Sequence, residues 1–254
     1  MGPDMGNETR LPASIISHEL ANSRSQRKSL WPSFYEIEGR RTIAAGTDMP
    51  TNVEVHRTAR VVSIDLDLAV AFYETFLPSG QDAKLIARVN ESDFYPAFNV
   101  ISDSLHRNAI MALCRIWDTQ SDSANLNSLA KMFRNNQVLT DLARAGHVVD
   151  PKQMKKWQAD VAKVKDSDEL EALMAARHRA LAHTANPNKA YRGKARVAVY
   201  GDERRVMEWT IPLVERANAF ISYSYARPFD EQRTIRREHA AKFWARVGES
   251  SPAN

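Results

Sequence analysis

Apolar side chains recur at steps of three and four residues along most of the chain beyond residue 57. This spacing gathers them on one face of an α-helix, whereas a half-buried strand would show strict alternation. The pattern predicts an all-α protein, a helical bundle of four to five core helices with an irregular N-terminal arm and a C-terminal helix. The segments expected to be helical are 57–77, 95–118, 126–133, 137–145, 150–165, 168–183, 212–226 and 231–247.

Two of these helices begin with recognisable capping residues. Asp93 is expected to cap the helix that Tyr95 and Pro96 open, because its side chain can accept hydrogen bonds from the first free N–H groups. Asp150 followed by Pro151 predicts a second start, since proline is favoured at the first helical position.

Prolines predict where two helices end, and one stretch of β-branched and aromatic residues predicts a strand. Pro78 is expected to end the first helix, and Pro228 to end the helix that begins near Pro212. The stretch from Val197 to Tyr200 is rich in β-branched and aromatic residues, which predicts one short strand that turns at Gly201.

These signals divide the chain into three parts. Residues 1–56 mix Gly, Pro, Ser and Asn without a sustained period, which predicts a poorly ordered N-terminal arm, a candidate leader or vector-derived segment. Residues 57–226 are expected to form the helical domain. Residues 227–254 are expected to form a C-terminal helix and tail, which packs at the periphery or against a second copy.

Composition narrows the class of protein. A chain of 254 residues that is 43% hydrophobic can bury a substantial core. It has no run of 18 apolar residues and no secretory signal pattern, which predicts a cytoplasmic protein with no membrane partner. The single cysteine, Cys114, lies among apolar residues and is expected to be buried, and it excludes an intrachain disulfide.

Positive charge is concentrated in one part of the sequence. The formal net charge of the chain is +4, whereas residues 177–205 alone carry eight basic residues against Asp202 and Glu203, an excess of six. Such a patch favours phosphate-rich partners, although a solvated loop would have the same composition. The eight are Arg177, Arg179, Lys189, Arg192, Lys194, Arg196, Arg204 and Arg205.

The start of this patch contains the closest grouping of candidate catalytic residues in the chain. Two arginines and two histidines, Arg177, His178, Arg179 and His183, fall within seven consecutive positions. A zinc site would need three or four ligands, and neither His-Glu-x-x-His nor paired-cysteine spacing occurs. A serine or cysteine hydrolase would need a nucleophile elbow, which is missing. The plain structural alternative is that Arg179 and His183 occupy a helix C-terminus, where the helix dipole favours cations.

The spacing Arg177-x₅-His183, ending in Ala182-His183-Thr184, resembles the Arg-x(4–6)-His motif of HEPN-domain proteins, in particular the abortive-infection AbiU-like branch. The stretch from Leu105 to Asp118, followed by 127–132, is similar to an earlier helix of that branch, which ends in Arg-x-x-Asp before a Ser-Leu helix. The resemblance covers roughly residues 57–226. One departure is His178, which stands where the family usually has Asn or Asp.

The resemblance implies a HEPN-like bundle, a homodimer, and metal-independent cleavage of RNA by 2′-hydroxyl attack in phage defence or a toxin–antitoxin setting. It implies no metal and no cofactor, and an antitoxin protein as a further partner. His183 would be the general acid/base, Arg177 would stabilise the phosphate, and His178 would support them. The candidate RNA-binding residues are Arg179, Arg192, Lys194 and Arg196.

Two other functions remain compatible with the residues. A non-catalytic helical module could bind RNA or a partner protein through the same basic surface. A structural oligomerising bundle would have no affinity for nucleic acid.

Arg115 and Asp118 are three residues apart on one predicted helix, so their side chains are expected to form an ion pair.

Overall fold

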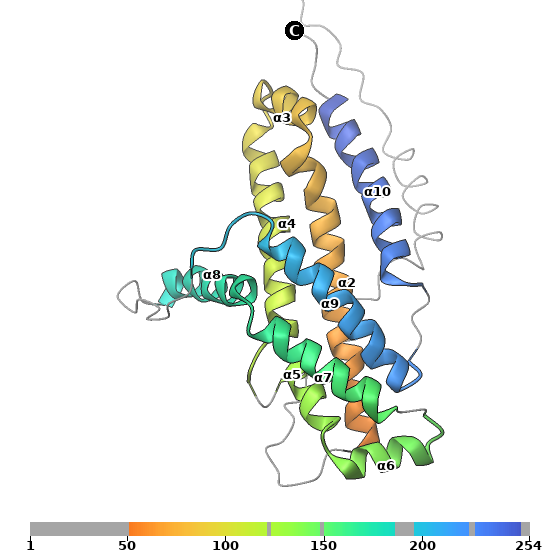
Figure 1. Cartoon of the computed structure of the whole chain (residues 1–254). Coiled ribbons are helices and arrows are strands. Elements are labelled where there is room, and N and C mark those ends of the chain that lie inside the picture. The colour runs from red at the N-terminus through yellow and green to blue at the C-terminus, as the bar shows by residue number, and fades with distance from the viewer. Residues whose placement is uncertain (1–50, 121–122, 148–149, 186–195, 224–226, 250–254) are drawn as a thin grey trace, which may run out of the picture. The chain divides into compact units, whose positions relative to one another are not determined.

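The computed structural model describes residues 51–120, 123–147, 150–185, 196–223 and 227–249, and side chains are not described for 179–185 and 248–249. Within these ranges the chain forms nine helices and no strands (Figure 1), which confirms the all-α prediction. The predicted N-terminal arm lies outside the described residues up to residue 50. None of the described helices is long and apolar enough to cross a membrane.

The centre of the fold is α2 (Asn52–Gln81), a helix of 30 residues that contacts α4 (Tyr95–Ile116), α9 (Asp202–Phe220) and α10 (Phe229–Glu249). Thr51 begins α2 with a capping box, in which its hydroxyl accepts from Glu54 N and the Glu54 carboxylate accepts from Thr51 N. The remaining helices are α3 (Ala83–Asn90), α5 (Leu126–Met132), α6 (Asn136–Arg144), α7 (Pro151–Lys165) and α8 (Asp168–Ala185).

The predicted N-terminal capping residue of α7 is confirmed, whereas the one predicted for α4 is wrong. The Asp150 carboxylate accepts a hydrogen bond from Lys152 N at 2.8 Å, and Pro151 is the first helical residue. At α4 the capping position belongs to Phe94, which makes no side-chain bond, rather than to Asp93. Pro96 lies in the first turn, where its missing N–H leaves no intrahelical bond unmade.

Two prolines that were expected to bound helices lie inside them. Pro78 stands in α2, which continues to Gln81 and ends at Asp82, whose carboxylate then caps α3. Pro212 stands in the middle of α9, which begins ten residues earlier than expected and ends at Phe220, well before Pro228. The apolar face of α9 is continuous across Pro212, and burying it offsets the proline's cost of about 3 kcal/mol.

The predicted strand from Val197 to Tyr200 is also wrong. Val197 and Val199 are exposed, and no strand lies beside them within the described residues. The segment is held instead by Asp202, whose carboxylate accepts from Val199 N at 2.9 Å and from the Arg196 guanidinium at 2.7 and 2.8 Å. Side-chain bonds to a helix N-terminus replace the ladder that a strand would need.

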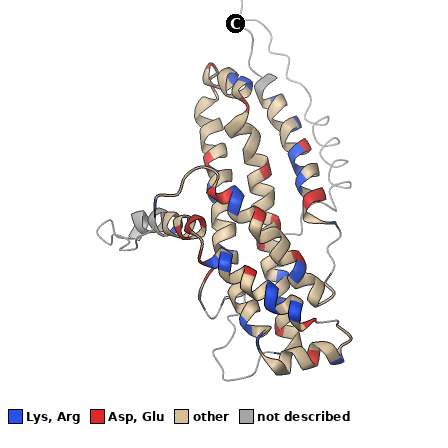
Figure 2. Cartoon of the chain, viewed as in Figure 1, with Lys and Arg blue, Asp and Glu red and all other residues tan. Residues whose placement is uncertain are grey.

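Three arginines of α10 form ion pairs with acidic residues of α2. The fully buried Glu74 accepts from Arg233 Nε at 2.8 Å and from Arg237 Nε at 2.9 Å, and Asp67 accepts from Arg236 at 2.6 Å. Acidic and basic residues are interspersed along this helix (Figure 2). Apolar contact comes from Phe229, which is buried in the main core, and from Trp244, which packs into a small cluster between α3, α4 and α10. The C-terminal helix is therefore part of the bundle's own packing.

Candidate active site

The predicted motif lies on α8, which includes every position from Arg177 to His183. Ser167 begins the helix, and its hydroxyl accepts from Leu170 N at 3.4 Å. Leu170, Leu173 and Ala175 are buried, because α8 packs against α4, α7 and α9. The buried face thus fixes where the motif positions lie relative to the end of α4.

Arg177 forms an ion pair with Asp118, a residue 59 positions earlier in the chain. The distance from Arg177 Nη1 to Asp118 Oδ2 is 3.1 Å, and the two side chains are 17% and 16% exposed. Asp118 follows directly after Trp117, the capping residue at the C-terminus of α4. The ion pair therefore joins the two sequence motifs, one at the end of α4 and the other on α8.

The chain around Asp118 is held by a residue of the following helix. Asn127 of α5 donates from Nδ2 to the carbonyl oxygens of Trp117 at 3.2 Å and Asp118 at 3.1 Å. Asp118 Oδ1 also accepts from Gln120 N at 3.2 Å. A carboxylate at a helix C-terminus is opposed by the negative end of the helix dipole, so Asp118 gains from a nearby cation. Arg177 supplies that cation.

The expected pair between Arg115 and Asp118 does not form. Arg115 Nη2 lies 2.7 Å from Oδ1 of Asp65 on α2 instead, and Asp65 is buried. The reason is that α4 ends at Ile116, so Asp118 is beyond the regular helix and the i, i+3 geometry no longer applies. The two members of the Arg-x-x-Asp pattern thus bind different helices, α2 and α8.

The Arg177 guanidinium is only partly used by the protein. Its Nε is buried and has no hydrogen-bond partner among the described residues, whereas Nη1 binds Asp118. A guanidinium has five N–H donors, so this group retains capacity for an anion.

The Arg177 guanidinium also lies near Cys114. Burial raises the pKa of the Cys114 thiol to about 12, and the nearby positive charge of Arg177 only partly opposes this shift. Cys114 is therefore a buried core residue, as predicted, and no thiolate nucleophile.

The other predicted site residues are described less completely. His178 is exposed on α8. Arg179 and His183 lie on the α8 backbone, but their side chains are outside the described part of the structure, as are Arg192 and Lys194 altogether. The structure thus brings Arg177 to the end of α4, whereas the side-chain placement of Arg179, His183, Arg192 and Lys194 stays a prediction.

The described basic side chains of residues 177–205 are paired with acidic side chains. Each of the four described basic residues forms an ion pair with an acidic residue. The bidentate bond from Arg196 to the buried Asp202 lowers the pKa of the Asp202 carboxyl and anchors the 196–200 segment. RNA binding by Arg196 remains a prediction, and its substitution would also disturb the fold. The four pairs are Arg177–Asp118, Arg196–Asp202, Arg204–Glu208 and Arg205–Glu169.

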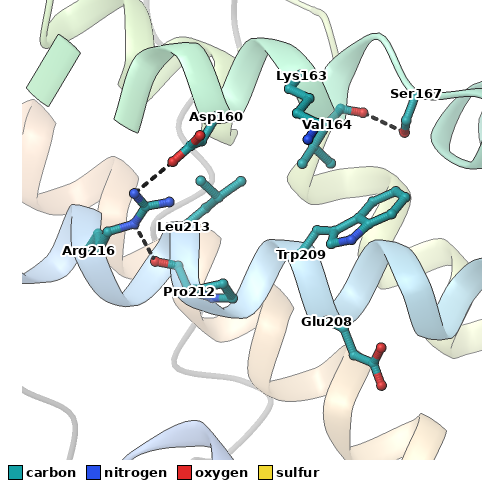
Figure 3. A pocket seen from close by; sticks show the side chains of 9 residues that line it. All are labelled: Asp160, Lys163, Val164, Ser167, Glu208, Trp209, Pro212, Leu213 and Arg216. Carbon is teal, nitrogen blue, oxygen red and sulfur yellow. Dashed lines mark hydrogen bonds and ion pairs between the residues drawn. The ribbon is translucent and has the colours of Figure 1, made fainter. Parts of the chain in front are cut away.

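A pocket of about 290 Å³ lies between α7 and α9 (Figure 3). Its walls are mainly apolar, with Trp209 and Leu213 from α9 and Val164 from α7. The Asp160–Arg216 ion pair, at 2.8 Å, borders it. The pocket contains none of the predicted site residues.

The backbone of α8 separates the two principal motif positions. Six residues of α-helix place them about 9 Å apart along the axis and about a third of a turn apart around it. Asp118 is the component that sequence reasoning did not assign to the site. Its signal was the position just beyond a helix end, where a carboxylate needs a cation.

The family model HEPN_AbiU2, described as AbiU2, matches residues 54–243 of the chain. This range includes both motifs, the Arg177–Asp118 pair and most of α10. Searches of curated proteins and of solved structures gave no significant match.

Proposed function

Because the chain belongs to the AbiU2 family of HEPN domains, we propose that it is a metal-independent endoribonuclease that acts in phage defence, by abortive infection or as part of a toxin–antitoxin pair. RNA carries its own nucleophile, the ribose 2′-hydroxyl. Attack of this oxygen on the adjacent phosphorus displaces the 5′-oxygen of the next nucleotide, leaving a 2′,3′-cyclic phosphate and a 5′-hydroxyl.

The protein then needs to move protons and to stabilise charge. His183 is assigned the proton transfer, since the imidazole pKa lies near working pH. Arg177 is assigned the negative charge that develops on the phosphate oxygens, which a guanidinium binds in a fixed fork. His178 is assigned a supporting role, and Arg179, Arg192, Lys194 and Arg196 are assigned contacts along the RNA.

The observation that carries this proposal is the half-buried Arg177, held by Asp118 while its Nε stays without a protein partner in the described residues. An arginine used only for structure is expected to have its buried donors satisfied. Among the described residues, one bond from Nη1 holds the guanidinium and Nε has no partner, so Nε is the donor that the proposal assigns to a ligand. That arrangement suits phosphate recognition.

The active unit in this proposal is a homodimer. Arg177 and His183 are separated around α8 by about a third of a turn, so one helix does not direct both positions toward one point. Two copies of α8 that meet at a dimer axis would form a composite cleft containing both motifs.

The direct test is cleavage of a 5′-labelled, mixed-sequence RNA of about 30 nucleotides in the presence of excess EDTA. We expect cleavage products that end in a 2′,3′-cyclic phosphate, and no cleavage of the same sequence with 2′-deoxyribose throughout. Cleavage of the DNA version, or activity that EDTA abolishes, would contradict the mechanism.

Asp118→Asn tests how the guanidinium is positioned. The amide preserves the shape of the side chain but removes its charge, so Arg177 loses its anchor and kcat is expected to fall about 10²-fold with little change in KM. Asp103→Asn, at an exposed ion pair on α4, is the matched control and should leave kcat unchanged. A change in KM alone would show that Asp118 affects binding rather than the chemical step.

A second candidate function is a non-catalytic module that binds RNA or a partner protein. It is favoured by Lys152, Lys156 and Lys163, which are exposed on one side of α7 and form no ion pair in the described residues. Lys163 also borders the pocket that contains Trp209. This function predicts salt-dependent binding of the labelled RNA with no cleavage product at any time.

A further inference from the structure

Two histidines meet at one end of the bundle, far along the chain from each other and outside the candidate active site. His56 lies in the second turn of α2, and His147 follows the end of α6. Their ring centres are 5.4 Å apart, with the ring planes inclined by 50°. Neither residue belongs to the α8 motif.

The backbone that presents these side chains consists of two similar helix ends. After α6, Gly146 has a φ of 87° and His147 N donates to Leu142 O at 3.0 Å. After α9, Ser222 has a φ of 52° and the next residue donates from its N–H to Asn218 O at 2.9 Å. Both are Schellman-type ends, so the negative ends of the α6 and α9 dipoles both lie next to the contact between His147 and Ser222.

Ser222 fixes the orientation of the His147 ring. Its Oγ lies 3.2 Å from His147 Nδ1, which occupies that ring nitrogen and leaves Nε2 as the one available for a ligand. Histidines that bind metals generally have their other ring nitrogen held in this way by an oxygen. The Ser222 hydroxyl is therefore well placed to orient a ligand rather than to act as one.

We propose that His56 and His147 bind a divalent transition-metal ion of the zinc, nickel or copper type. With a metal–nitrogen distance of about 2.0–2.1 Å and tetrahedral geometry, two imidazoles sharing one ion have ring centres about 5 Å apart. The separation of 5.4 Å between the two ring centres in the structure is close to this value. Imidazole nitrogen is a preferred ligand for these three ions.

A third observation concerns Asn52, one helical turn before His56 on α2. Its Oδ1 is buried and has no hydrogen-bond partner in the described residues. No cluster of three His, Cys, Asp or Glu side chains occurs in the described part of the chain. The proposed site therefore comprises two imidazoles, with water as the remaining ligands, and it links the start of α2 to the ends of α6 and α9; the Asn52 oxygen is an unpartnered polar atom one turn away on the same helix.

The test is calorimetric titration of the untagged full-length chain with ZnCl₂ at pH 7.5, after removal of metal with a chelator. We expect saturable binding of one ion per chain, together with a rise in melting temperature that depends on the zinc concentration. His56→Gln and His147→Gln should each abolish the saturable binding. His239→Gln, which removes an exposed histidine on α10, is the matched control and should bind as the unmodified chain does.

Ser222→Gly tests whether the Ser222 hydroxyl orients the His147 ring. Glycine lacks the hydroxyl but tolerates the positive φ, so the backbone of this turn should be preserved. Zinc affinity should fall about 10- to 100-fold without loss of stability. Binding that persists in both histidine variants, or no binding by the unmodified chain, would overturn the proposal. RNA cleavage is unaffected by either result, since the His56–His147 site is separate from Arg177.

Discussion

His183→Ala is expected to lower the rate of RNA cleavage by about 10²- to 10⁴-fold, the usual contribution of a general acid or base. In the proposed mechanism RNA supplies the nucleophile, so loss of the proton carrier should slow the chemical step and leave binding intact. Cleavage rates should be measured in single-turnover reactions with enzyme in excess. Binding of the fully 2′-deoxy analogue should be measured in parallel and should not change.

The controls for His183→Ala come from the same molecule. His239→Ala removes an exposed histidine of α10 and should cleave as fast as the unmodified chain. Circular dichroism should show the same helix content in both variants. If His183→Ala retains more than about a tenth of the rate, the assignment of the general acid/base to this residue is wrong, and His178 becomes the next position to test.

Glu74→Ala is expected to have the largest effect on stability. Glu74 is fully buried and binds two arginines, and Arg233 is itself only 14% exposed. Removing the carboxylate leaves a poorly solvated guanidinium without its partner, which costs about 3–5 kcal/mol. Urea unfolding at pH 7 should show this loss as a lower midpoint, and the melting temperature should fall by about 6–20 °C.

An exposed ion pair provides the comparison for Glu74→Ala. Asp103 and Arg107 form an i, i+4 pair on α4 in which both side chains are more than half exposed. Asp103→Ala should cost only about 0–1 kcal/mol, because water solvates both charges after the pair is broken. Equal effects of the two substitutions would show that α10 is held by its apolar contacts instead.

Helical periodicity predicted most of the fold because the core helices each bury a regular apolar face. The prediction was weakest where a single residue type was taken as a boundary. Pro212 lies inside α9 because the buried face continues on both sides and outweighs one lost hydrogen bond, and α2 continues for three residues beyond Pro78. The short α3 was not predicted, because only Leu85 and Val89 are buried on it. Its start depends on Asp82, which also ends α2.

The sequence pointed to Arg177 as a candidate site residue because its motif is contiguous in sequence, and its role in the site stays a prediction. The role of Asp118 was not predictable from helical spacing, since that spacing points to Arg115 rather than to α8. Only the packing of α8 on α4 brings the two charges together. In the same way, Arg196 looked like part of a basic surface, whereas its position places it against the buried Asp202.

Because Cys114 is buried, the rate at which its thiol is modified reports how often the folded chain opens. The protein has one thiol, which is inaccessible in the folded state and has a pKa of about 12, so a reagent that attacks thiolates can react only after the core opens. The rate of modification under native conditions therefore measures opening of the α2–α4 interior without any introduced label. It also means that a cysteine placed on the surface can be modified selectively, with negligible background from the native sequence.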